Sequence, residues 1–109
     1  MKQDIFQAIA DPTRRQILEE LANGEKNLNT LASSFDISRP AVSKHVKLLS
    51  ECGLIKIRKE GRERWCVPQP QALDEVTDWV EKYRTLWQER FDKLASYLDE
   101  LQTKTNKNK

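Results

Sequence analysis

The sequence contains few of the residues from which active sites and metal centres are usually built. Its 109 residues include one histidine, two cysteines and three glycines. Ser43 and His45 are two positions apart on a predicted helix, so their side chains point in different directions and do not form a catalytic pair. Neither cysteine belongs to a C-x-x-C pair, and no glycine-rich phosphate loop occurs. We therefore expect a protein that is not an enzyme and that holds no metal or other cofactor.

Long apolar segments are also missing. No run of about 18 apolar residues occurs, and the first residues lack the basic and then apolar order of a secretion signal. We therefore expect a cytoplasmic protein with no membrane partner. In that compartment Cys52 and Cys66 are expected to be reduced thiols.

The charges that are present are divided unevenly along the chain. The formal net charge is only +2. Residues 36–64, however, carry eight Lys and Arg against four Asp and Glu, whereas residues 71–102 carry four against eight. A basic centre followed by an acidic segment indicates two surfaces with different partners, one of them a polyanion.

Apolar spacing and helix-breaking residues predict four short helices in the first half of the chain. They are expected at residues 3–10, 12–23, 28–35 and 38–52. Pro12 suits the first position of the second helix, and Ser38 suits the N-cap of the fourth, where Pro40 is tolerated in the first turn. The third and fourth helices are joined by a short turn, which is the spacing of a helix-turn-helix.

A two-stranded hairpin is predicted directly after these helices. Residues 54–59 and 62–67 alternate in character and are separated by a turn at Gly61. Four cations lie near its tip, namely Arg58, Lys59, Arg62 and Arg64. A basic hairpin behind a helix-turn-helix is typical of a wing, whose cations suit contacts with phosphates or the minor groove.

A helix of about thirty residues is predicted from about Gln71 to residue 102. Its apolar residues recur with a period near 3.5, at Leu73, Val76, Val80, Tyr83, Trp87, Phe91, Leu94, Leu98 and Leu101. Because this helix extends beyond the small core that precedes it, we expect part of the stripe to face a second subunit. The residues expected to form a homodimer are Ile5, Phe6, Trp79, Val80, Tyr83, Trp87, Phe91, Leu94 and Leu98.

The predicted fold is therefore mainly α, a winged helix-turn-helix of about five helices and a two-stranded wing, with a long C-terminal dimerisation helix. The expected divisions are a DNA-binding domain at 1–69, the dimerisation helix at 70–102 and a disordered tail at 103–109. The tail is expected to be disordered because it contains only Thr, Lys and Asn.

Several segments resemble the ArsR/SmtB family of winged-helix transcriptional repressors. They are residues 10–15 (ADPTRR), 37–46 (ISRPAVSKHV), 53–55 (GLI) and 60–62 (EGR). The resemblance covers about residues 4–68, and it implies a homodimer that represses transcription by occupying an operator, with each recognition helix in a major groove. The metal-sensing members hold their ligands as cysteines near the third helix or as histidines on the last helix. This sequence has neither, so it resembles a branch without those metal ligands.

DNA contacts are expected from the exposed face of helix 38–52 and from the wing. The candidate residues are Ser38, Arg39, Pro40, Ser43, Lys44, His45, Lys47, Arg58, Lys59, Arg62 and Arg64. Arg39 suits either a guanine edge or a phosphate. His45 suits a half-buried structural role, a DNA contact or a pH-sensitive group. The predicted function is a homodimeric repressor of a pseudo-palindromic site on double-stranded DNA.

Two other functions remain open from the sequence. The winged domain suits a protein-interaction module, although its cations favour DNA. A sensor is the second alternative, in which oxidation of Cys52 and Cys66, or an unknown small-molecule effector on the C-terminal aromatic face, releases the DNA. Packing of small thiols and of aromatic rings at a dimer interface is the simpler interpretation of both features.

Overall fold

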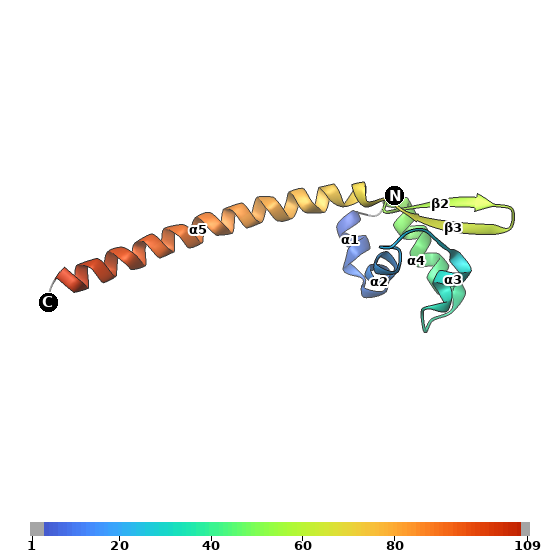
Figure 1. Cartoon of the computed structure of the whole chain (residues 1–109), viewed down its shortest axis with the longest axis horizontal. Coiled ribbons are helices and arrows are strands. Elements are labelled where there is room, and N and C mark those ends of the chain that lie inside the picture. The colour runs from blue at the N-terminus through green and yellow to red at the C-terminus, as the bar shows by residue number, and fades with distance from the viewer. Residues whose placement is uncertain (1–3, 108–109) are drawn as a thin grey trace. The chain divides into compact units, whose positions relative to one another are not determined.

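The computed structural model describes residues 4–107, with side chains described as far as residue 104. Figure 1 shows the helices and strands in chain order. They are α1 (Ile5–Ala10), α2 (Pro12–Glu20), β1 (Lys26–Asn27), α3 (Leu28–Ser33), α4 (Arg39–Glu51), β2 (Ile55–Glu60), β3 (Glu63–Pro68), the 3-10 helix η1 (Pro70–Leu73) and α5 (Asp74–Lys107). The chain divides into two compact units after Val76, so the 3-10 helix and the first residues of α5 belong with the first unit.

One apolar core holds the first unit together. Every helix from α1 to α4 and two of the strands contribute buried side chains to it. These are Ile5, Ala8, Ile17, Leu21, Leu28, Leu31, Ala32, Val42, Val46, Leu49, Leu54, Ile55 and Cys66. Helix α4 packs against α2, α3 and β2, and it buries Val42, Val46 and Leu49, which lie on one face at helical spacing.

Two arginines of α2 stabilise the end of α1. The last four carbonyls of an α-helix have no partner within the helix. Arg14 donates hydrogen bonds to the carbonyls of Gln7 and Ala8, at 3.0 and 2.7 Å. Arg15 donates to the next two carbonyls, those of residues 9 and 10, at 2.8 and 3.0 Å. The two positive side chains also oppose the negative end of the dipole of α1, so they fix α1 against α2.

The sheet has three antiparallel strands in the order β1-β3-β2. The predicted hairpin is confirmed, with β2 and β3 paired from Ile55↔Pro68 to Glu60↔Glu63. Its turn contains Gly61, whose φ of 60° lies in the left-handed region that glycine adopts without strain. A third strand was not predicted: β1 pairs with β3 through Lys26↔Cys66 and Asn27↔Trp65. A strand of two residues is too short to show an alternating pattern.

Several helix ends differ from the predicted ones. Helices α2 and α3 end at Glu20 and Ser33, each shorter than expected, and α1 begins at Ile5 behind the N-cap Asp4. Helix α5 continues to Lys107, although composition predicts disorder from residue 103. No glycine or proline interrupts this segment, and adding residues to an existing helix costs little. Residue 3, where the first helix was expected to begin, and residues 108 and 109 lie outside the described part of the chain.

The apolar stripe of α5 lies along one side of the helix. Its positions recur every eleven residues, as Val76, Trp87 and Leu98, as Val80 and Phe91, as Tyr83 and Leu94, and as Leu86 and Tyr97. Eleven residues over three turns is close to the natural pitch of an α-helix, so the stripe follows one side of the helix with little drift. From Trp79 to Leu101 its side chains are between 37% and 60% exposed. No helix within residues 4–107 is both long and apolar enough to span a membrane.

The core predicts a clear effect for one substitution in α4. Leu49 is fully buried, so Leu49→Ala should lower the free energy of unfolding by about 2–5 kcal/mol, measured by urea denaturation. The exposed neighbour Glu51 provides the control, because Glu51→Ala should change stability by no more than about 0.5 kcal/mol. Equal stability of the two variants would contradict the position of Leu49 in the core.

Candidate nucleic-acid interface

The first turn of α4 is fixed by its own residues. The Ser38 hydroxyl oxygen accepts a hydrogen bond from the Ala41 N–H at 3.2 Å, which makes Ser38 the N-cap. Pro40 follows in the first turn, where its missing N–H costs no hydrogen bond. Ser38, Arg39, Pro40 and Lys44 are all exposed. The N-terminal end of α4 is therefore well defined, and one side of its first two turns is exposed to solvent.

One edge of α4 faces the wing. Arg39, Ser43 and Lys47 recur every four residues and so lie along one edge of the helix. Arg39 and Ser43 line a hollow of about 300 Å³ together with Arg62 and Arg64 of the wing. Ser43 and Lys47 line an adjacent hollow of about 240 Å³, which Arg64 and Cys66 also border. Together the two hollows form what we call the helix-wing groove.

The pairing register of the hairpin separates the cations of the wing onto two faces. Residues opposite each other in an antiparallel pair point to the same side of the sheet. Lys59 pairs with Arg64, and Ile57 pairs with the buried Cys66, so this face is the one turned toward α4. Arg58 pairs with Trp65 and lies on the opposite face.

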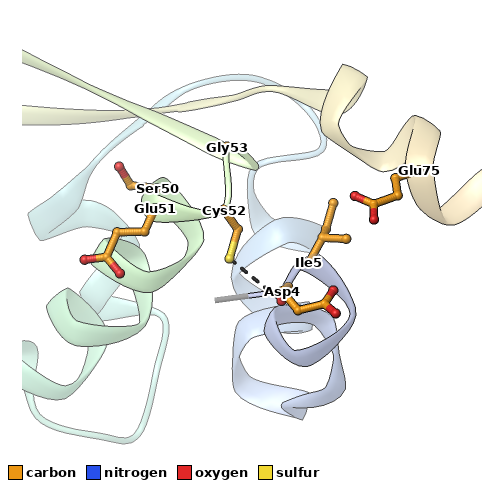
Figure 2. A pocket seen from close by; sticks show the side chains of 7 residues that line it. All are labelled: Asp4, Ile5, Ser50, Glu51, Cys52, Gly53 and Glu75. Carbon is orange, nitrogen blue, oxygen red and sulfur yellow. Dashed lines mark hydrogen bonds between the residues drawn. The ribbon is translucent and has the colours of Figure 1, made fainter. Parts of the chain in front are cut away.

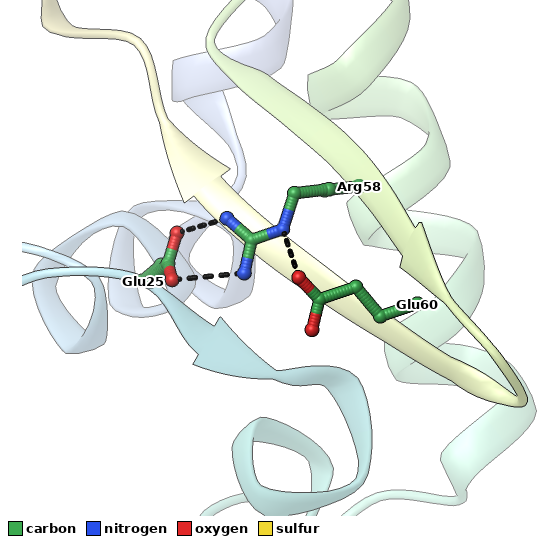
Figure 3. Close-up of polar contacts among 3 residues, drawn as sticks. All are labelled: Glu25, Arg58 and Glu60. Atoms are coloured by element: carbon green, nitrogen blue, oxygen red, sulfur yellow. Dashed lines mark hydrogen bonds and ion pairs between the residues drawn. The ribbon is translucent and has the colours of Figure 1, made fainter.

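Unlike the other cations of the wing, Arg58 is bound by carboxylates of the protein itself (Figure 3). Its guanidinium group donates two hydrogen bonds to Glu25, at 2.7 and 3.0 Å, and lies 3.2 Å from a carboxylate oxygen of Glu60. The same group lies 5.7 Å from the centre of the Trp65 ring. The arginine lowers the pKa of Glu25, mainly by hydrogen bonding, and Glu25 raises the pKa of Arg58. Arg58 therefore ties the wing to the segment before β1, and its charge is already neutralised.

His45 lies on the side of α4 that faces α2. Its Nδ1 atom is 3.4 Å from a guanidinium nitrogen of Arg14, the residue that also binds the end of α1. The backbone N–H of Arg14 donates to Asp11, the N-cap of α2, and this hydrogen bond lowers the pKa of Asp11. The half-buried His45 thus belongs to a polar cluster that connects α1, α2 and α4, an arrangement that favours its structural role.

The two cysteines occupy different surroundings. Cys66 is buried in β3, and burial raises the pKa of its thiol to about 11. Cys52 follows α4 and lines a hollow of about 570 Å³ with Asp4, Glu51 and Glu75 (Figure 2). Its sulfur lies 3.9 Å from the Asp4 carbonyl oxygen. A protonated, buried thiol is a poor nucleophile, which weakens the redox hypothesis.

The described residues contain no metal-binding cluster, and the predicted dimer residues differ in their exposure. Among the described residues, no group of three or more His, Cys, Asp or Glu side chains is arranged to hold a metal ion. Ile5 is only 6% exposed, because it packs into the core of its own chain, so little of its surface is left for a partner. Phe6 is partly buried against the same core, whereas the predicted dimer residues of α5 are exposed.

Comparison with known proteins identifies the family. Residues 11–56 match the bacterial regulatory proteins of the arsR family. The chain is 31% identical over 77 residues to the transcriptional repressor SdpR of Bacillus subtilis (strain 168), covering 71% of this chain and 86% of SdpR. The chain belongs to the ArsR family. The family and this relative are transcriptional regulators rather than enzymes.

Solved structures of ArsR-type proteins have the same fold. The crystal structure of an ArsR family transcriptional regulator shares 38% identity with this chain at a TM-score of 0.72, covering 77% of this chain and 92% of that one. A homodimeric winged helix-turn-helix DNA-binding domain from Mycobacterium bovis, 23% identical, covers 74% of this chain and 75% of its own at a TM-score of 0.60. The predicted fold is thereby confirmed, with α3 and α4 as the helix-turn-helix and β2 and β3 as the wing.

Some residues at this interface carry no signal in the local sequence. Asn27 and Asn29 line the helix-wing groove beside Arg39, although no motif marks either as a DNA contact. Glu25 is 33 positions away from Arg58, and nothing in the local sequence indicates their pairing. The resemblance to ArsR proteins included Arg14 and Arg15, whose hydrogen bonds to α1 became evident only in the fold.

Thiol labelling tests the environment of Cys66 in this ArsR protein. At pH 8 almost all of a thiol with a pKa of about 11 stays protonated, so Cys66 should resist iodoacetamide in the folded protein. In urea it should be labelled fully, which mass spectrometry of the peptides would detect. The half-buried Cys52 provides the internal comparison and should react first. Labelling of native Cys66 as fast as Cys52 would contradict the assigned environment.

Proposed function

We propose that the protein is a homodimeric transcriptional repressor that binds a pseudo-palindromic operator in double-stranded DNA through α4 and the wing. The observation that carries this proposal is a set of exposed cations without carboxylate partners on α4 and the wing. Arg39, Lys47, Arg62 and Arg64 line the helix-wing groove, while Lys44 lies on the exposed side of α4 and Lys59 near the tip of the wing. Within residues 4–107, none of them forms an ion pair with a carboxylate.

Cations without carboxylate partners are suited to the phosphates of DNA. Each phosphate that a protein neutralises releases condensed counterions, so affinity falls steeply with added salt. Lys44 lies at the exposed side of the first turns of α4, beside Pro40 and away from the groove, where a recognition helix presents side chains to base edges. We therefore assign base contacts to Lys44 and its neighbours Ser38 and Pro40. Lys47 and Lys59 contact the backbone.

The exposed stripe of α5 supports the dimer. From Trp79 to Leu98 it exposes large apolar side chains along one side of a helix that continues to Lys107. A contiguous apolar surface of this length is typical of a protein interface. The homodimeric state of the domain from Mycobacterium bovis agrees with this assignment. A two-fold dimer would place its recognition helices about 34–36 Å apart, one turn of DNA.

The other hypotheses receive less support. A protein-interaction module would not need six cations without carboxylate partners on α4 and the wing. The aromatic residues of α5 stand along one side of a single helix, and packing against a second copy explains that arrangement directly. A small-molecule effector is therefore not part of the proposal.

The function can be tested by selecting binding sites from random DNA duplexes. We expect the protein to enrich an inverted repeat and to bind it with a steep dependence on salt, measured by fluorescence anisotropy. Lys44→Ala should weaken binding to this site by about 1–3 kcal/mol and relax preference at one base pair of each half-site. Lys82→Ala on α5 removes the same charge from an exposed position and should leave the affinity unchanged. Failure to enrich any sequence would refute the function.

The dimer predicts different effects for two substitutions on opposite sides of α5. Leu94 belongs to the apolar stripe, whereas Ser96, two positions later, points to the polar side. Leu94→Asp should produce monomers, because it places a charge within the interface. Ser96→Asp should leave the protein dimeric. Light scattering after size-exclusion chromatography measures the mass, and a Leu94→Asp dimer would exclude this face as the interface.

A further inference from the structure

Three arginines from separate places in the chain meet at the wide end of the helix-wing groove. Arg39 is the first residue of α4, Arg62 lies in the turn between β2 and β3, and Arg64 lies on β3. All three line the same hollow of about 300 Å³. Ser43, Asn27 and Asn29 add a hydroxyl and two amide groups to its wall, so most of the lining can donate hydrogen bonds.

Among the described residues, no negatively charged group compensates this concentration of positive charge. Within residues 4–107, no acidic residue lines the hollow, and no carboxylate forms an ion pair with any of the three arginines. The opposite face of the same hairpin shows the contrast, because Arg58 there is bound by Glu25 and Glu60. Repulsion among neighbouring cations is relieved when an anion binds between them.

The chemistry of the lining selects a phosphate group. A guanidinium group presents its donors as a planar fork that matches two oxygens of a phosphate, and it keeps its charge at any physiological pH. Several such forks around one hollow give an anion more donors than a single surface lysine provides. One side of the hollow is formed by the recognition helix α4 and another by the wing. An anion bound there therefore contacts both elements at once.

We infer that this hollow binds one phosphodiester group of the DNA backbone, held by Arg39, Arg62 and Arg64. The inference rests on the proposed function and deepens it, since it gives one phosphate a defined place between α4 and the wing. It also assigns Arg39 to the backbone, a choice that the sequence left open between a phosphate and a guanine. Sequence preference then comes from other residues of α4, and the bound phosphate fixes the wing against the recognition helix.

The first test compares affinity with sequence preference. Arg39→Ala, Arg62→Ala and Arg64→Ala should each weaken binding to the selected operator and to random DNA by the same factor, about tenfold. Each should also flatten the dependence of affinity on salt by up to about one phosphate's contribution. Arg84→Ala on α5 removes an exposed arginine elsewhere and should change neither quantity. Arg64→Lys should recover only part of the affinity, because it keeps the charge but loses the fork.

A second test uses inorganic phosphate alone and so does not depend on an operator. Titration of the full chain with phosphate should shift the side-chain Nε–H signals of Arg39, Arg62 and Arg64 in a saturable way by NMR. The signal of Arg84 should not saturate, and chloride at the same ionic strength should not reproduce the shifts. Equal shifts with chloride would show an adventitious ion only, and would overturn the site.

The two tests separate failure of this inference from failure of the function. An altered preference at one base pair in Arg39→Ala, with an unchanged salt dependence, would show that Arg39 reads a base and would overturn the inference while the function stands. Wild-type affinity in all three folded variants would also overturn the inference and leave the function standing. Saturable phosphate binding by a protein that selects no DNA sequence would refute the repressor function and assign the hollow to a free anion.

Discussion

The packing of α4 into the core determines where every other candidate DNA contact lies. Val42, Val46 and Leu49 bury one face of this helix against α2, α3 and β2. Because interiors are densely packed, these contacts fix both the position of α4 and its rotation about its own axis. The exposed position of Lys44 and the alignment of Arg39, Ser43 and Lys47 toward the wing follow from that rotation.

Polar contacts around α4 connect it to the elements beside it. Arg14 of α2 binds the end of α1 and reaches His45 on α4, so one side chain connects all three helices. On the other side, Arg58 and Glu25 hold the hairpin to the segment that precedes β1. Exposed ion pairs of this kind contribute little to stability, and their effect here is to restrict geometry. The recognition helix and the wing are thereby held in one unit.

The starts of the helices from α2 to α4 were largely predictable because they depend on nearby residues. Ser38 caps α4 and Pro12 begins α2 as expected, and the turn at Gly61 lies where the hairpin was predicted. The candidate contacts on α4 follow from its apolar spacing for the same reason. The short strand β1, the roles of Arg14 and Arg15, and the separation of Arg58 from the other wing cations were not predictable, since each depends on a partner elsewhere in the fold.

The sequence by itself determined the order of the elements, the apolar faces of α4 and α5 and the basic character of the centre of the chain. These properties arise from spacing within a few residues, where helical and strand geometry relate position directly to direction. Only the tertiary structure decided which wing cations are free. Pairing Lys59 with Arg64, and Arg58 with Trp65, assigns alternate residues to opposite faces, and a shift by one residue would exchange them. Glu25 then meets Arg58 across 33 positions, while Arg62 and Arg64 join Arg39 at the groove, because folding brings together charges that are distant along the chain.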